Sequence, residues 1–336
     1  MQSDPNGNAS GKVAAVTPIF LLSAPRSGST LLQRLLSAHP KIHSIPESWL
    51  VPATLAVFSS QPAINALSVR WTRIALDETE RHSPGIREAA MLGCGLGLLK
   101  AFSSACPYGS VYFLEKTPRN SLVLPELAAA FPTARFVFLW RNPLAIRASM
   151  NTTWSKGGWH FRSKADLYEG LAQMIDQRDR LAARACDIRY EALVNNPQGE
   201  LDAIFEFLGL DTIDVQDAFA AGRGTVEGRL GDPGLKRDSR TSVVSADRDW
   251  AQQYGNPFRR AWARRYLAWL GEKRLAKIGC DQAQLLAELS AGRGQTRRMA
   301  SDLMRVVYAH FNERILFEHW FTGRAGALSR KRVPLD

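Results

Sequence analysis

The chain alternates between short apolar runs and longer segments in which apolar residues recur every three or four positions. The run at 19–22 has the length and composition of a buried strand, and Leu31, Leu32, Leu35 and Leu36 follow it at helical spacing. Further strands are predicted at 41–45, 111–114, 136–140 and 187–190. Further helices are predicted at 86–102, 122–131, 164–184, 200–208, 257–278 and 296–321, and another begins at Pro143 with Asn142 as its N-cap.

Strands that alternate with helices predict an α/β fold, in which a central parallel sheet is flanked by helices in three layers. In such sheets ligands bind beyond the carboxyl ends of the strands. The segments after Leu22, Leu114 and Trp140 lie at these ends and are the candidate functional segments. Residues 222–250, rich in Gly, Asp, Ser and Arg, are expected to form a long loop.

The segment from Ser23 to Thr30, SAPRSGST, links the first strand to its helix and has the composition of an anion-binding loop. Small residues let the backbone approach a ligand, the helix's first amides are unpaired, and Arg26 adds a positive charge. An ATP-binding P-loop would need Gly at position 23 and Lys at position 29, where this chain has serine. A loop without that lysine is poorly equipped for a triphosphate with magnesium and suits a shorter anionic group.

A second anion site is indicated by Arg141 and Ser149, which are eight residues apart at the start of the helix after the strand 136–140. Eight residues is a little over two helical turns, so both side chains could face one ligand, and an arginine fork matches a phosphate. The ordinary alternative is an arginine at a sheet edge and a serine on a polar helix face. Taken alone, the pair favours that alternative.

Glu47 follows a predicted strand and could accept a proton from an attacking hydroxyl beside a cationic site, although a single glutamate is more often solvated or capping. His39 and His43 are the rival bases, of which the first more simply ends a helix and the second belongs to a strand. Lys116 ends another strand, before a rigid turn rich in hydrogen-bond donors at 117–119. A functional role and a surface charge are about equally favoured for it.

Length and apolar content are those of a globular protein, and the net charge is +11 over 336 residues. The basic charge is concentrated at the end, because residues 251–336 hold 16 of the 43 Lys and Arg residues but 7 of the 32 Asp and Glu residues. No apolar run is long enough to span a membrane, and no signal peptide is evident. The four cysteines are scattered without metal or redox spacing and are expected to be buried, reduced thiols, which fits a cytoplasmic protein: Cys94, Cys106, Cys186 and Cys280.

The basic C-terminal segment has two interpretations. It could contact an acidic membrane surface or a polyanion, or its aromatic residues could pack on the core while the arginines are solvated, which is the favoured interpretation. No specific nucleic-acid partner is expected, because no recognition motif accompanies the charge. The residues concerned are Arg259, Arg260, Arg264, Arg265, Lys273, Arg274 and Lys277, interleaved with Trp262, Tyr266 and Trp269.

SAPRSGSTLL, LWRNPLAIRAS and IRYEALVNNP together resemble the P-loop-like sulfotransferases, which use 3′-phosphoadenosine 5′-phosphosulfate (PAPS). EKTPRN, and a His-Pro pair followed by Glu47, are similar in particular to the tyrosylprotein sulfotransferase branch and its bacterial relatives. The resemblance covers about residues 18 to 250. It implies a P-loop-like three-layer fold, divided here into a flexible N-terminus at 1–17, a sulfotransferase domain at 18–254 and a helical basic C-terminal extension at 255–336.

The resemblance also implies a role for each matching residue. Glu47 matches the general base and Lys116 a lysine near the transferring sulfonate, while Arg26 serves both cofactor binding and catalysis. The residues that match the loop for the 5′-phosphosulfate are Arg26, Ser27, Gly28, Ser29 and Thr30. Arg141 and Ser149 match the pair that binds the 3′-phosphate, and Tyr190 matches a tyrosine that contacts the cofactor. Lys236 and Arg237 are the candidates for the family's C-terminal cofactor loop, which has no clean equivalent here. The tyrosylprotein enzymes carry two adjacent acids where this chain has Pro46 and Glu47, which weakens the assignment of the base.

The implied reaction is in-line transfer of a sulfonate from PAPS to an acceptor hydroxyl, with no metal, because the protein supplies the cations. A glycan, lipid or small metabolite is preferred over protein tyrosine as the acceptor. The alternatives are a catalytically silent nucleotide-binding protein and, with less support, an ATP-dependent kinase.

Overall fold

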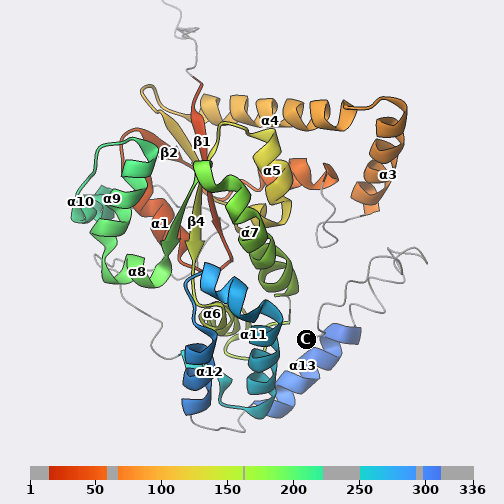
Figure 1. Ribbon diagram of the computed structural model, residues 1–336, viewed down its shortest axis with the longest axis vertical. Coiled ribbons are helices and arrows are strands. Elements are labelled where there is room, and N and C mark those ends of the chain that lie inside the picture. The colour runs from red at the N-terminus through yellow and green to blue at the C-terminus, as the bar shows by residue number, and fades with distance from the viewer. Residues whose placement is uncertain (1–14, 59–66, 162, 222–249, 293–297, 312–336) are drawn as a thin grey trace, which may run out of the picture.

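A computed structural model describes residues 15–58, 67–161, 163–221, 250–292 and 298–311 (Figure 1). Its sheet has five parallel strands in the order β2-β3-β1-β4-β5. The strands are β1 (Thr17–Ser23), β2 (Ile42–Ser44), β3 (Tyr112–Glu115), β4 (Arg135–Trp140) and β5 (Ala185–Arg189). The predicted parallel α/β sheet is confirmed, and each strand predicted from an apolar run is present within two residues of the expected ends.

The helices are α1 (Ser29–Leu36), α2 (Leu50–Leu55), α3 (Leu67–His82), α4 (Ile86–Ala105), α5 (Leu124–Ala130), α6 (Pro143–Ser155), α7 (Leu171–Arg178), α8 (Tyr190–Asn195), α9 (Pro197–Leu208), α10 (Val215–Ala221), α11 (Pro257–Lys277), α12 (Gln282–Ala291) and α13 (Met299–Phe311). The 3₁₀ segments are η1 (Ala56–Phe58), η3 (Pro118–Val123), η5 (Asp179–Arg184) and η7 (Trp250–Tyr254), and η4 (Ala165–Gly170) is a π-helix.

The helices differ from the sequence prediction in three ways. The single helix predicted at 164–184 is divided into η4, α7 and η5. Tyr190, predicted as the end of a strand, is the first residue of α8. Helices α2, α3, α8, α10 and α12 were not predicted. As predicted, α6 begins at Pro143, and the Asn142 side chain accepts hydrogen bonds from the amides of Leu144 and Ala145.

Each face of the sheet is covered by its own set of helices, because alternate residues of a strand point to opposite faces. On β1, Ile19 and Leu21 pack into one apolar cluster with α1, α9 and α10, whereas Phe20 and Leu22 pack into another with α4, α5, α6 and α7. Figure 1 shows α1, α8, α9 and α10 on one side of the sheet and α5 and α7 on the other. The architecture is therefore the predicted three-layer arrangement.

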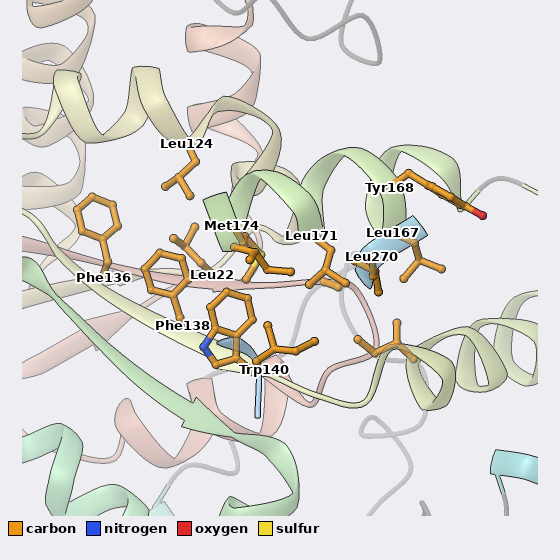
Figure 2. Packing of buried hydrophobic residues seen from close by; sticks show 14 of the residues in the cluster. Leu22, Leu124, Phe136, Phe138, Trp140, Leu167, Tyr168, Leu171, Met174 and Leu270 are labelled. Carbon is orange, nitrogen blue, oxygen red and sulfur yellow. The ribbon is translucent and has the colours of Figure 1, made fainter. Parts of the chain in front are cut away.

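The larger of these clusters joins the sheet to the C-terminal helices. Figure 2 shows Phe136 and Phe138 of β4 facing Leu171 and Met174 of α7, with Leu270 of α11 alongside. All five side chains are at most 4% exposed. Burial of apolar side chains of this size stabilises the folded state by roughly 1.5–3 kcal/mol each.

Helix α11 shows where the aromatic and basic residues of the C-terminal segment lie. Trp262 and Tyr266 are buried in the core, and Arg274 and Lys277 form ion pairs with Asp176 and Asp179. The packing of aromatic residues on the core is therefore confirmed. The prediction that the arginines are solvated, by contrast, is wrong for Arg259, which is buried.

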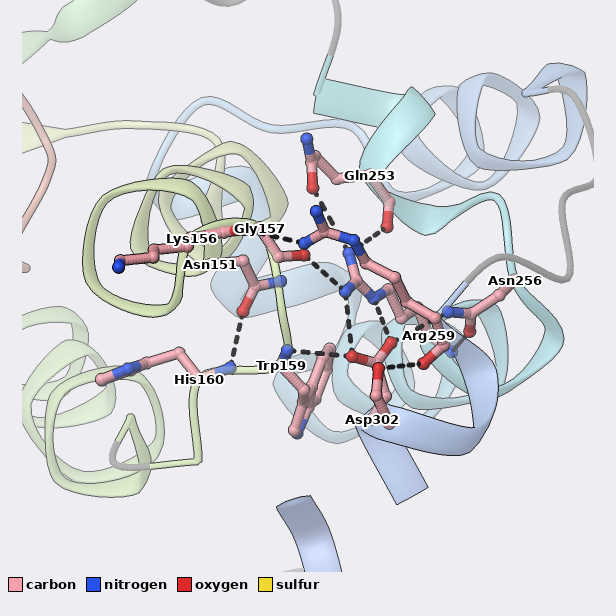
Figure 3. Close-up of polar contacts among 11 residues, drawn as sticks. Asn151, Lys156, Gly157, Trp159, His160, Gln253, Asn256, Arg259 and Asp302 are labelled. Atoms are coloured by element: carbon pink, nitrogen blue, oxygen red, sulfur yellow. Dashed lines mark hydrogen bonds and ion pairs between the residues drawn. The ribbon is translucent and has the colours of Figure 1, made fainter. Parts of the chain in front are cut away.

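Arg259 is 4% exposed and forms an ion pair with Asp302 of α13, at 2.7 Å between Nε and Oδ2. Figure 3 shows the same guanidinium donating to the carbonyl of Gly157, and Asp302 accepting from the Trp159 amide. Asn256 also donates to Asp302 at 3.0 Å. A buried charge needs such partners, so this cluster fixes α11 and α13 to the segment after α6.

The four cysteines are free thiols, but each is half-buried and not fully buried as predicted. Within the described part of the chain, no helix is both long and apolar enough to cross a membrane. The loop predicted at 222–250 lies almost entirely outside the described residues, as do the predicted N-terminal segment up to residue 14 and the last part of the helix predicted at 296–321.

Trp262→Ala tests how far α11 contributes to the core. The indole contacts the rings of Trp159 and Tyr266 at centroid distances of 5.1 and 4.9 Å. We expect the free energy of unfolding to fall by about 3–5 kcal/mol, measured by urea denaturation followed with far-ultraviolet circular dichroism. Trp154→Ala, at a tryptophan that is 43% exposed, is the control and is expected to cost less than about 1 kcal/mol. Equal losses would show that α11 is not an integral part of the core.

Candidate functional site

Three neighbouring strands bring their carboxyl ends to one edge of the sheet. β1 lies between β3 and β4, with Phe20 opposite Glu115 on one side and Ser23 opposite Leu139 on the other. The segments that leave these strands therefore begin side by side. They carry the predicted anion loop, Lys116 and Arg141.

The predicted anion loop, Ser23 to Thr30, connects β1 to the first turn of α1 and is called the cradle below. Arg26 and Gly28 have positive φ angles of 70° and 91°, and Gly28 is the N-cap of α1. No acidic residue occupies the first turn of this helix, and Ser29 and Thr30 are buried there. The unpaired amides and the positive end of the helix dipole therefore suit an anionic ligand.

Tyr190 closes one side of the cradle. A Cβ at Gly28 would lie 2.5 Å from Cδ2 of its ring, so only glycine fits beneath this tyrosine. The Arg141 guanidinium carbon lies 4.1 Å from the centroid of the same ring. The ring is thus held between the cradle and the arginine that follows β4, a cation–π arrangement.

Arg26, Arg141 and Ser149 are brought into direct contact. Arg26 Nε donates to Ser149 Oγ at 3.2 Å, and the Arg141 guanidinium donates to the carbonyl oxygen of Arg26. Arg141 is 7% exposed, which places a largely desolvated positive charge beside the cradle. The Arg26 guanidinium and the Ser149 hydroxyl thus meet at the edge of the sheet, and the Arg141 guanidinium lies against the backbone of Arg26. Donors of these kinds suit an anionic group with several oxygens.

The cradle also has donors that the described residues leave unused. The hydroxyl groups of Ser23 and Ser27 are buried, and neither has a hydrogen-bond partner among the residues that the structure describes. A buried hydroxyl without a partner is costly, and a ligand oxygen at the cradle would satisfy it. These hydroxyls fit the loop to an anionic group with several oxygens.

Glu47 and Lys116 form a buried ion pair, with 2.5 Å between Oε1 and Nζ. The lysine side chain is 1% exposed and the glutamate side chain 11% exposed. Lys116 is thus a buried cation at the end of β3 and not the snorkelling surface charge that was the alternative. Two of the three residues predicted to be catalytic, Glu47 and Lys116, thus lie together although they are 69 positions apart in the chain.

The two histidines weighed as rival bases lie elsewhere. The His39 ring contacts the Asp211 carbonyl at 3.2 Å and accepts from the Lys41 amide at 3.1 Å, and burial is the main cause that lowers its pKa. His43 lies in β2 against Phe113, and burial lowers its pKa too. Within the described chain, neither ring hydrogen-bonds to Glu47 or Lys116. Lys236 and Arg237 lie outside the described residues.

Glu115 was missed by the sequence interpretation. It is the last residue of β3, is 2% exposed, and accepts hydrogen bonds from Ser48, Thr117 and Asn120. Burial is the main cause that raises its pKa, and these three hydrogen bonds and the charge of Lys116 lower it in part. A charged residue at the end of the otherwise apolar run 111–114 was the available signal.

Gln33 was also missed. Its amide on α1 donates to the Ser44 hydroxyl at 2.8 Å and to the Ile45 carbonyl at 2.9 Å, and its side chain is fully buried. This contact ties the helix of the cradle to the segment that carries Glu47. In the part of the chain that the structure describes, no group of three His, Cys, Asp or Glu side chains is placed to hold a metal ion.

A family model described as "Sulfotransferase family" matches residues 18–214. The nodulation protein NoeE of Sinorhizobium fredii is 30% identical over 57% of this chain and 50% of its own length. The protein-tyrosine sulfotransferase 1 of Danio rerio is 24% identical over 57% of this chain and 53% of its own. The chain thus spans about half the length of these relatives.

Solved structures of sulfotransferases are also similar. The sulfotransferase domain of the olefin synthase of Synechococcus PCC 7002 has a TM-score of 0.46 at 21% identity, covering 70% of this chain and 87% of the domain. Mouse sulfotransferase SULT7A1, solved in complex with PAP, has a TM-score of 0.44 at 15% identity, covering 78% of this chain and 88% of its own.

Gly28→Ala tests the close approach of Tyr190 to the cradle. The substitution adds left-handed backbone strain and an overlap with the ring, and overpacking of this kind costs about 1–3 kcal/mol. Gly85→Ala is a matched control, because Gly85 has φ of 90° and nothing within 4 Å of its added Cβ. We expect the free energy of unfolding to fall further for Gly28→Ala, by about that overlap cost. Equal losses in the two variants would contradict the close packing.

Proposed function

This chain belongs to the sulfotransferase family, and from that premise we propose that it transfers a sulfonate group from PAPS to an acceptor hydroxyl. The observation that carries the proposal is the contact between its two anion-binding elements. Arg26 in the cradle reaches Ser149 on α6, and Arg141 reaches back to the carbonyl of Arg26. A ligand with two separate anionic groups suits this arrangement, and PAPS has a 5′-phosphosulfate and a 3′-phosphate.

The residues of the site divide between these two groups. We assign the 5′-phosphosulfate to the cradle, where the amides after Gly28, the hydroxyls of Ser27 and Thr30 and the guanidinium of Arg26 are donors. We assign the 3′-phosphate to Arg141 and Ser149. When bound, PAPS supplies an activated sulfonate whose leaving group is a phosphate.

Tyr190 supports the same assignment through packing. Its ring is fixed by Gly28 on one side and Arg141 on the other, so it links the sites of the two anionic groups. This also orients the Arg141 guanidinium before a ligand arrives. Pre-organised donors lose less freedom on binding, and affinity rises accordingly.

We assign to Glu47 the role of accepting the proton of the acceptor hydroxyl. Oε1 of its carboxylate accepts from Lys116, and within the described residues Oε2 has no hydrogen-bond partner. Oε2 would accept the proton as the acceptor hydroxyl attacks. The Lys116 ammonium and the Arg26 guanidinium would stabilise the negative charge that develops during transfer.

The burial of Lys116 supports its assigned role. A desolvated ammonium interacts more strongly with a developing negative charge than one in water does, because the surrounding dielectric is lower. The ion pair with Glu47 keeps this ammonium in place before the reaction. Glu47 is the more exposed partner of the two, as an acceptor arriving from solvent requires.

For the acceptor we propose only a chemical class, which is a hydroxyl group of a glycan, a lipid or a small metabolite. The segments expected to shape its pocket are 48–110, 151–165 and 222–250. Most of the last segment lies outside the described residues.

Ligand-dependent stability tests the nucleotide preference. A ligand that binds only the native state raises the midpoint of thermal unfolding, and the rise grows with its concentration relative to Kd. We expect 3′,5′-adenosine diphosphate (PAP), the desulfated product of PAPS, to raise the midpoint more than ATP with magnesium at equal concentration. The reverse order would reject PAPS in favour of the kinase alternative.

Glu47→Gln tests the general base. The amide oxygen can still accept from Lys116, but the side chain can no longer take a proton. We expect transfer of radiolabelled sulfonate from PAPS into fractionated host extract to fall by about 10²–10⁴-fold, with PAP affinity within about twofold of wild type. Glu206→Gln, at an exposed residue of α9, is the control and should keep full activity. Wild-type turnover in Glu47→Gln would remove this residue from the role.

A further inference from the structure

We propose that Glu115 is the residue that positions Glu47 and Lys116, by holding the two segments that carry them at a fixed separation. The proposal rests on the sulfonate transfer proposed above, for which these two residues are the reacting pair. Glu115 does not contact Glu47 itself. It acts through the chain neighbours of the pair.

Two consecutive residues of one segment meet two consecutive residues of the other. Lys116 pairs with Glu47 at 2.5 Å, and Glu115 accepts from the Ser48 hydroxyl at 3.0 Å. These are two separate contacts, made by neighbouring residues at the end of β3. The segment 47–48 is therefore attached to the strand end at two points, and rotation about one contact is blocked by the other.

A third contact closes the same arrangement. The Thr117 hydroxyl donates to Glu115 Oε1 at 2.7 Å and accepts from the Trp49 amide at 3.4 Å. Trp49 has φ of 57°, a left-handed conformation that a non-glycine residue adopts only where its surroundings hold it. The turn that presents Glu47 is thus fixed through one carboxylate.

The hydrogen-bond directions explain why an acceptor is needed at this position. Ser48 accepts from the Leu50 amide and Thr117 from the Trp49 amide, while both hydroxyl protons are donated to Glu115. The Asn120 side-chain amide donates to the other carboxylate oxygen of Glu115, Oε2. An ionised carboxylate has only acceptors, so it satisfies all three donors at once. Removing it would leave donors unpaired in a site where Thr117 and Asn120 are fully buried.

Glutamine at position 115 should still hold the two segments together to a large extent. Its amide oxygen can accept from the two hydroxyls, and its NH₂ group would then face Asn120. Asn120 Oδ1 is buried and has no hydrogen-bond partner among the described residues, so rotation of the Asn120 amide would present that oxygen to the new donor. Glu115→Gln is therefore the conservative variant, and Glu115→Ala the disruptive one.

The kinetic test uses the full chain with radiolabelled PAPS and a fixed amount of host extract as the acceptor pool. A displacement of about 1 Å in a catalytic group can cost 10²-fold, so we expect the apparent kcat to fall by about 10²-fold in Glu115→Ala. Ser48→Ala removes one contact and should lose about tenfold. KM for PAPS and PAP affinity should stay within about twofold of wild type in both variants, and Glu115→Gln should recover kcat to within about tenfold.

Ser103→Ala is the matched control for Ser48→Ala. Ser103 is a buried serine of α4 whose hydroxyl accepts from the Val16 amide at 3.4 Å, and it contacts neither Glu115 nor the pair of Glu47 and Lys116. A purely structural effect would lower activity equally in both serine variants. That outcome, or wild-type kcat in Glu115→Ala, would overturn the proposal. If Glu115→Ala fails to fold, the kcat values of Ser48→Ala and Glu115→Gln test the proposal in its place.

A crystal structure of each variant gives a measurement that does not depend on activity. We expect the contact between Lys116 Nζ and Glu47 Oε1 to persist in Glu115→Gln and to be lost in Glu115→Ala or Ser48→Ala. An intact contact in all three variants would overturn the positioning role. If the wild-type protein transfers no sulfonate and does not bind PAP, the proposed function fails, and these distances still decide whether Glu115 positions the pair.

Discussion

The site depends on the parallel pairing of β3, β1 and β4. Because the hydrogen bonds of the sheet fix the register of these strands, the segments that follow Glu115, Ser23 and Trp140 leave the sheet at one edge. Three cationic side chains, Arg26, Lys116 and Arg141, are delivered there from parts of the chain that are far apart in sequence. A shift of one strand by one residue would turn its side chains to the opposite face.

Gathering positive charge at a partly buried edge has an energetic cost, and the structure offsets it locally. Lys116 pairs with Glu47, and Arg141 stacks on Tyr190 while donating to a backbone carbonyl. Further from the site, Arg147 is fully buried between the rings of Trp159 and Trp262. In the site, the anionic ligand that we propose would add a further partner to these cations. In the core, the Arg147 guanidinium carbon lies 3.8 Å from the centroid of the Trp159 ring and 4.7 Å from that of the Trp262 ring.

The C-terminal helices show how a charge pattern can mislead. Residues 257–277 read as a basic amphipathic helix, and its aromatic residues do pack on the core as the favoured interpretation held. Arg259 nevertheless belongs to the interior, because Asp302, 43 positions later, supplies a fully buried carboxylate. Periodicity identifies the apolar face of a helix. It does not show which charged residue has a buried partner in a distant helix.

The sequence alone determined the strands, most of the helices, the N-cap at Asn142 and the composition of the anion loop, because these depend on residues within a few positions of one another. The tertiary structure decided which of the candidate residues meet. Arg26 and Ser149 are 123 positions apart, and Glu47 and Lys116 are 69 apart. It also revealed Glu115, whose partners Ser48 and Asn120 lie on both sides of it in the sequence. Contacts over such separations follow from the strand order of the sheet, and no local pattern encodes that order.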